Sequence, residues 1–160
     1  MSYEFYMTIE GTKQGKFKGE SSRTAHKDKS ACIQFSYGVK APRDVATGMA
    51  SGKRQHDMFV AVKEIGPSTP QLFQACVTNE VLKTVLFEYI HTTKEGKEEV
   101  YYTVKLTNAT VAAVKQYFSQ SAKHSESADV HELEEISFTF QKIDMEHKVA
   151  KTAASDDWTV

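Results

Sequence analysis

Hydrophobic and polar residues alternate along much of this 160-residue chain, most regularly near its C-terminal end. There, three apolar residues alternate with three polar ones, Ile136, Phe138 and Phe140 with Ser137, Thr139 and Gln141. Because successive side chains of a strand point to opposite faces, this pattern predicts a strand with one dry and one wetter face. We expect the strand to begin near Leu133 and to continue past Ile143 towards Met145.

The same alternation predicts two strands in the first 40 residues. Their apolar positions are Tyr3, Phe5, Met7 and Ile9 in the first and Ile33, Phe35, Tyr37 and Val39 in the second. We expect Ile33, Phe35 and Tyr37 to enter the core. Between the two strands, three glycines from Gly11 to Ser21 interrupt regular structure, and their spacing matches no phosphate-binding motif.

The segment from Lys40 to Asp57 is rich in small and polar residues and has no sustained period. A structureless segment of this length inside a compact domain is usually a binding loop or a disordered one. We interpret it as a contact arm that a partner orders. The residues assigned to the arm are Lys40, Arg43, Asp44, Met49, Lys53, Arg54, His56 and Asp57.

One short helix is predicted after residue 67. Ser68 and Gln71 have the spacing of a capping box. Alternatively, Thr69 is the cap and Pro70 lies in the first turn. Both readings place the helix start within two residues, so the sequence predicts the helix but leaves its cap open.

Several other segments have strand character. Residues 58–65 form one strand, and the apolar runs 81–90 and 100–107 form a hairpin, because a charged segment containing a glycine joins them. Residues 110–118 fit a helix or a strand, and their β-branched and aromatic residues favour a strand. Residues 119–129 read as a polar loop.

Charge and composition limit the classes of function. Lysine plus arginine (20) nearly balance aspartate plus glutamate (21), for a formal charge of −1, which argues against nucleic acid as a partner. The longest basic cluster is only Lys53–Arg54 beside His56. We expect no cleaved secretory signal and no membrane insertion, because no basic segment precedes an apolar stretch and the apolar runs are short.

The two cysteines and the tryptophan are read as structural residues. Cys32 and Cys76 lie far apart in apolar surroundings without a CxxC motif, which predicts two reduced, buried thiols and folding in the cytoplasm. Trp158 is an aromatic anchor close to the C-terminus, where chains usually fray. We therefore expect the charged tail around Trp158 to pack on its own sheet.

We predict no catalytic, cofactor-binding or metal-binding residue. The six histidines lack metal-ligand spacing, and neither GxSxG nor a reactive-cysteine context is present. Two groups of carboxylates are close in sequence, Glu132, Glu134 and Glu135, and Glu95, Glu98 and Glu99. We interpret both groups as exposed charges that keep strand edges soluble.

Several segments, in order along nearly the whole chain, resemble the hemolysin-coregulated protein (Hcp) family of type VI secretion tube subunits. They are Tyr6–Gly11 with Lys18–Ser21, Phe35–Gly38, Ser68–Leu72 with Ala75–Cys76, Ile136–Phe140 with Ile143, and Asp157–Trp158. The resemblance implies a mainly β fold over a single domain, residues 1–160. It implies a compact barrel of two packed antiparallel sheets with one short flanking helix.

The resemblance further implies hexameric rings that stack into a tube and are exported with effector proteins in the lumen. The implied partners are other copies of the chain, the sheath and spike proteins of the machine, and effectors. The protein would be cytoplasmic when made and then secreted without a cleaved signal peptide. No cofactor and no enzymatic turnover are expected.

Three surfaces receive roles under this resemblance. The arm is assigned to contacts between subunits, because a cyclic ring joins two different surfaces. The first loop is longer than in the commoner family form, and we assign it to ring stacking with the residues Thr12, Lys13, Gln14, Lys16, Phe17 and Lys18. Gln34 and Ser36 are assigned to the lumen wall. The alternative is a monomeric β-barrel that binds a small apolar ligand, which needs an unfilled interior; a hydrolase is disfavoured.

Overall fold

The computed structural model describes residues 4–19, 28–118 and 132–158, so the expected polar loop at 119–129 lies outside them. Its elements are β1 (Glu4–Gly11), β2 (Gly15–Lys16), β3 (Ser30–Ser36), β4 (Val39–Lys40), β5 (Gln55–His56), β6 (Phe59–Glu64), α1 (Thr69–Thr78), β7 (Leu82–Thr92), β8 (Glu98–Phe118), β9 (Glu132–Thr139), β10 (Lys142–His147) and β11 (Thr152–Asp157). The mainly β fold with one short helix is confirmed.

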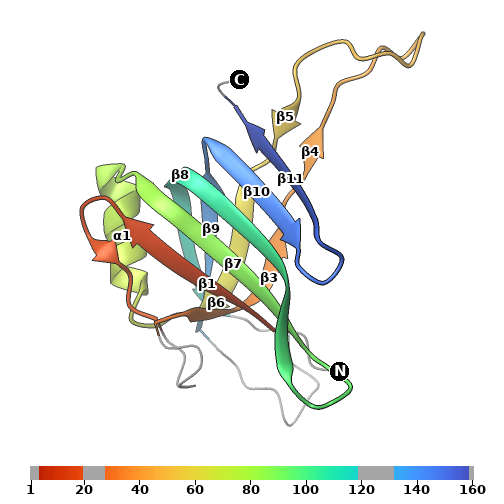
Figure 1. The fold of residues 1–160 in the computed structure, drawn as a ribbon. Helices are drawn as coiled ribbons and strands as arrows, with labels where there is room; N and C mark the ends of the chain where they lie inside the picture. Colours follow the sequence, from red (N-terminus) through yellow and green to blue (C-terminus); the bar gives the residue numbers. More distant parts are fainter. Residues whose placement is uncertain (1–3, 20–27, 119–131, 159–160) are drawn as a thin grey trace.

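Six strands close into a barrel. The order is β8-β7-β1-β3-β6-β9, and β9 pairs with β8 again, so the sheet returns to its first strand. All of these pairings are antiparallel. Beyond the barrel, β10 and β11 extend the sheet from β8, and β4 and β5 form a separate two-stranded ribbon. Figure 1 shows this ribbon reaching beyond the end of β11.

The long strand β8 pairs with different strands along its length. Its first half, up to Ala109, pairs with β7, and its second half, from Thr110, pairs with β9. The segment 110–118 is therefore a strand, as predicted. Asn108 has a left-handed φ of 49°, which marks the bend between the two halves.

The predicted strand at 133–145 is two strands, which is a correction. β9 and β10 both lie along β8, with Thr139 opposite Thr110 and Lys142 opposite Thr107. The partner on their other edge changes, however, from β6 to β11. Between them the amide of Gln141 donates to the Thr107 carbonyl, so the chain stays beside β8 while its other neighbour changes.

The barrel interior is filled with side chains. The largest fully buried apolar residues are Phe59, Phe87, Phe138, Met7, Leu72, Leu82, Leu106 and Ile136. Phe59 and Phe87 stack with their ring centroids 4.4 Å apart. Dense interiors of this kind leave little space for a ligand.

The second predicted strand enters the core only in part. Tyr37 packs against the core, and the ring of Phe35 stacks on Phe59 while remaining partly exposed. The expectation for Ile33 was wrong, because it is 57% exposed. The β3–β6 register shifts between Cys32 and Gln34, so Ile33 lies at an irregularity that interrupts the alternation.

Helix α1 covers one side of the barrel, with Leu72 and Ala75 buried beneath it. Ser68 occupies the N-cap position without a side-chain cap bond, so the capping box does not form, whereas Pro70 lies in the first turn as predicted. The Thr69 hydroxyl accepts from the Gly66 amide (3.0 Å). Both cysteines are reduced, but they are half-buried rather than fully buried.

One predicted surface carboxylate lies in the core. Glu134 is fully buried and forms an ion pair with Lys63, which is also fully buried and lies opposite it on β6. The Thr69 hydroxyl donates to Glu134 Oε1 (3.0 Å), which ties the start of α1 to the barrel. The interpretation of Glu134 as an exposed charge was wrong, because the sequence alone does not show the lysine that compensates it.

Candidate functional site

The arm is an ordered β-ribbon, which corrects the expectation of a structureless segment. β4 and β5 pair through Val39–His56 and Lys40–Gln55, and an isolated bridge joins Arg43 to Ala50. At the tip, the Asp44 amide donates to the Met49 carbonyl (2.7 Å). The pairs that form the ribbon therefore lie within a single chain.

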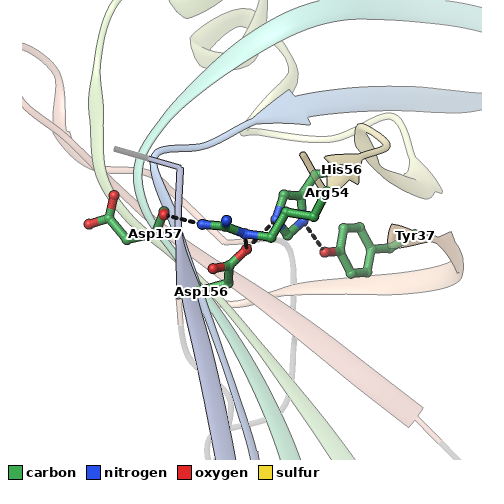
Figure 2. A network of polar contacts seen from close by, with 5 residues as sticks. All are labelled: Tyr37, Arg54, His56, Asp156 and Asp157. Carbon is green, nitrogen blue, oxygen red and sulfur yellow. Dashed lines mark hydrogen bonds and ion pairs between the residues drawn. The ribbon is translucent and has the colours of Figure 1, made fainter. Parts of the chain in front are cut away.

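A polar network fixes the root of the arm to the C-terminal strand β11 (Figure 2). His56 lies between Tyr37 and Asp156, with Tyr37 Oη 2.6 Å from His56 Nδ1 and Asp156 Oδ2 2.6 Å from His56 Nε2. Arg54 Nε donates to the same Oδ2 atom, and a terminal nitrogen of Arg54 donates to the Asp157 carbonyl (2.8 Å). Residues about 100 positions apart in sequence thus hold the ribbon against the sheet.

The protonation pattern of this network follows from its donors. Hydrogen bonds from Arg54, and then from His56, lower the pKa of Asp156, so its carboxylate accepts and does not donate. His56 Nε2 must therefore carry a proton, and in neutral His56 the Tyr37 hydroxyl donates to Nδ1. Burial, and then the negative charges of Asp156 and Asp57, raise the pKa of Tyr37 and keep its hydroxyl protonated.

Trp158 completes the root from the other side. Its ring lies 4.9 Å from the His56 ring and 6.4 Å from the Phe140 ring. Its amide donates to the Gln141 carbonyl (2.9 Å). The prediction that the tail packs on its own sheet is confirmed, and the segment before Trp158 is itself a strand, β11.

The predicted arm residues divide into a root and an exposed remainder. Arg54, which is itself exposed, and His56 belong to the root network; the other residues, all exposed, lie outside that network, and they are Lys40, Arg43, Asp44, Met49, Lys53 and Asp57. At the tip, Val45 is fully exposed and Met49 is 69% exposed. Sequence reasoning missed Tyr37 and Asp156, because only the strand pairing brings them to the arm.

The predicted stacking loop is tied down at its centre. Glu80, which is buried, accepts hydrogen bonds from the backbone amides of Lys13 (3.2 Å) and Gln14 (3.0 Å). The Gln14 side chain also donates to the Gln71 carbonyl of α1 (3.0 Å). Phe17 packs in the core, so it does not contribute its side chain to the surface, whereas Thr12, Lys13, Lys16 and Lys18 are exposed.

The two predicted lumen residues, Gln34 and Ser36, are both exposed on β3. They line a shallow hollow of 230 Å³ beside Val60, Tyr117 and Glu135. The structure thus places both side chains on an accessible face of the barrel. Their assignment to a lumen stays a prediction.

Within residues 4–19, 28–118 and 132–158, no group of histidine, cysteine and acidic side chains has the arrangement of a metal site. In the same ranges, no helix has the length and apolar character needed to cross a membrane.

These features define a class of protein, an antiparallel β-barrel with a filled interior and a protruding, exposed ribbon. A model of the family described as "Type VI secretion system effector, Hcp" matches residues 6–147. The chain belongs to the Hcp family of the type VI secretion system.

Known relatives resemble the chain over nearly its whole length. The "Major exported protein" of Pseudomonas aeruginosa is 32% identical, covering 99% of this chain and 96% of its own. A crystal structure of an Hcp protein superposes with a TM-score of 0.91 at 30% identity, covering 98% of each chain. The secreted protein Hcp3 of Pseudomonas aeruginosa gives a TM-score of 0.79 at 28% identity, covering 98% of this chain and 99% of its own.

Proposed function

We propose that this protein, as a single tube domain over residues 1–160, forms hexameric rings that stack into the inner tube of a type VI secretion system. The rings are exported without a cleaved signal peptide and carry effector proteins in their lumen, and the sheath and spike proteins are the other partners. The single observation that carries this proposal is the full-length likeness to Hcp proteins, with a TM-score of 0.91.

The physical character of the barrel supports a structural subunit over the ligand-binding alternative. A barrel holds a small apolar ligand only when side chains leave room inside it. Here Phe59, Phe87 and Phe138 are all buried in that interior. Because side chains fill the interior, other molecules meet this protein at its outer surface. This fits a structural role, which needs neither a cofactor nor catalytic turnover.

The first test is the mass of the purified protein by light scattering, with negative-stain images of the same fraction. The expected particle is a ring of six 18.0-kDa chains, about 108 kDa. A strict monomer at high concentration, together with saturable binding of an apolar dye, would replace this proposal with the ligand-binding barrel.

The arm gives a second test. Deleting residues 46–53 removes Met49 and most of the exposed tip, keeps Lys40 and Gln55, and leaves all residues of the root network in the chain. We expect a folded monomer with an unchanged circular dichroism spectrum. Intact rings in this deletion variant would contradict the assignment of the arm to the contact between subunits.

The lumen and stacking assignments are tested by separate variants. Replacing Ser36 by glutamine should leave rings intact but reduce retention of a co-expressed effector, whereas Thr92→Gln, also at an exposed strand position, should not. Replacing Lys16 and Lys18 by glutamate should leave single rings intact but reduce their stacking into tubes. Unchanged retention or unchanged stacking would contradict the corresponding assignment.

A further inference from the structure

A hollow lies at the end of the barrel away from helix α1, where β1 begins and β7 ends (Figure 1). It has a volume of 370 Å³, and strands β1, β3, β7 and β8 contribute its lining. Phe59 and Phe87, which fill the interior, do not belong to that lining, so the hollow is separate from the core. Its volume is within the range of sites that bind small molecules.

Two β-bulges contribute their extra residues to this hollow. Residues 32–34 of β3 face only two residues of β6, so Ile33 is the extra residue. Residues 100–102 of β8 face only two residues of β7, so Tyr101 is the extra residue there. Both Ile33 and Tyr101 line the hollow. Because a bulge re-aims a side chain and bulges are frequent beside functional sites, both irregularities help to shape a site here.

Aromatic rings form much of the wall of the hollow. The ring of Tyr89 stacks on the ring of Phe5, with the centroids 5.1 Å apart. Phe35 packs edge-on against both, at 5.5 Å from Phe5 and 5.1 Å from Tyr89. The ring of Tyr101 is held by stacking on His91 at 4.5 Å. Such a wall offers apolar contacts to a flat ligand, and the faces of its rings attract a cation.

The charge at the hollow is negative. Among the described residues that line it, Glu4 is the one charged side chain. Glu4 is exposed, and the hydroxyl of Tyr6 donates to its Oε2 atom (2.8 Å), which orients the carboxylate. A carboxylate beside aromatic rings complements a ligand with a positive charge and repels one with a negative charge.

A buried hydroxyl in the wall has no partner. Tyr89 is 6% exposed, and its hydroxyl is shielded from solvent and has no hydrogen-bond partner among the described residues. Burial, and then the neighbouring Tyr102, Cys32 and Tyr101, raise the pKa of Tyr89, so the hydroxyl stays protonated and can donate. A buried hydroxyl without a partner costs free energy, and a ligand that brings an acceptor to it removes this cost.

We propose that this hollow binds a small aromatic amine that carries a polar group at the end opposite its ammonium. The ammonium lies beside Glu4 at the exposed rim, the ring packs against Phe5 and Phe35, and the polar group accepts a hydrogen bond from the hydroxyl of Tyr89. The site adds ligand binding to the structural role. It does not depend on the proposed function, and it does not need an empty barrel interior.

The test is calorimetric titration of the full chain with tyramine, a phenol that carries an ethylammonium group. Tyramine should bind saturably. The matched anion 3-(4-hydroxyphenyl)propionate, which has a carboxylate in place of the ammonium, should bind at least about tenfold more weakly, because it meets the carboxylate of Glu4. Absence of saturable tyramine binding, or equal binding of the anion, would overturn the proposal.

Two pairs of variants locate the site. Ile33→Trp fills the hollow and should abolish tyramine binding, whereas Val77→Trp on α1 should not, although the two positions are 57% and 58% exposed. Glu4→Gln should weaken binding about tenfold, whereas Glu10→Gln, which is also exposed on β1, should leave it unchanged. Equal effects within either pair would place the binding elsewhere and overturn the assignment.

The hydroxyl of Tyr89 is tested by Tyr89→Phe, with phenethylamine, which lacks the phenolic hydroxyl, as the matched probe. The variant should bind tyramine no better than phenethylamine. Its free energy of unfolding without ligand should not fall, because the hydroxyl has no described partner in the free chain. Unchanged tyramine binding would overturn the role of Tyr89. Light scattering of the same samples measures ring formation separately, so failure of ligand binding leaves the tube function standing.

Discussion

The barrel and the arm are stabilised in different ways. In the barrel, aromatic and aliphatic side chains are buried, and even the ion pair of Lys63 and Glu134 is excluded from solvent. In the arm, nearly every residue from Lys40 to Asp57 is exposed, and backbone pairs plus one polar network at the root hold it in place. Burial makes the barrel a rigid scaffold, whereas the arm leaves its apolar tip available for a contact.

The largest effect expected from this comparison is in the barrel. Replacing Glu134 by glutamine removes the charge that compensates the buried Lys63, which should lower the free energy of unfolding by about 3–5 kcal/mol. Urea denaturation measures the change. The double variant K63M/E134L should recover most of the loss, because it removes both buried charges together; a double variant as unstable as the single one would contradict this account.

A smaller effect is expected at the junction of barrel and arm. Trp158 is 50% exposed and contacts the rings of His56 and Phe140. Replacing it by alanine should cost about 1 kcal/mol, the scale of an aromatic pair. Phe73 on α1 is similarly exposed and is the matched control, with an expected change within about 0.5 kcal/mol. Equal losses of stability in the two variants would contradict the role of Trp158 as an anchor of the tail.

The root network adds a dependence on pH. The pKa of Asp156 is lowered in the folded state below its ordinary value of 3.8, mainly because Arg54 and then His56 donate to its carboxylate. Its stabilisation is therefore fully present above about pH 4 and is lost as the pH falls through the lower folded-state pKa. The stability difference between the wild type and Asp156→Asn should shrink as the pH falls below about 4, where the carboxylate of Asp156 becomes protonated. A difference that does not shrink below that pH would contradict the network.

The smallest effect on stability is expected at the arm tip. Replacing the exposed Val45 by serine buries or exposes nothing in the single chain, so the free energy of unfolding should change by less than about 0.5 kcal/mol. The mass measured by light scattering should nevertheless fall, because the proposed function assigns the arm to the contact between copies. If the variant instead unfolds more easily while its assembly is unchanged, the tip serves the stability of the chain and not a contact between copies.

Much of the fold could be predicted from local pattern. Alternation predicted the strands around Phe5 and Phe138, and β-branched content correctly favoured a strand at 110–118. The alternation gave wrong predictions at positions where the burial of a side chain depends on the neighbouring strand. Ile33 is exposed because the register of β3 shifts, and Glu134 is buried because Lys63 lies opposite it.

The candidate site was predictable only in part. Low periodicity and small polar residues predicted the location of the arm. They did not predict that the arm is a ribbon, because two-residue strands are too short to show alternation. His56 and Arg54 were selected as arm residues, whereas Tyr37 and Asp156, their partners in the root, were not.

The sequence by itself determined the strand content, the short helix, the location of the arm and the likeness to the Hcp family, because these depend on periodicity and on motifs that are local in the chain. The tertiary structure decided the barrel's closure, the buried ion pair and the joining of Arg54 and His56 to Asp156. These features depend on which strands become neighbours. Because pairing joins residues up to about 100 positions apart, no local pattern encodes it.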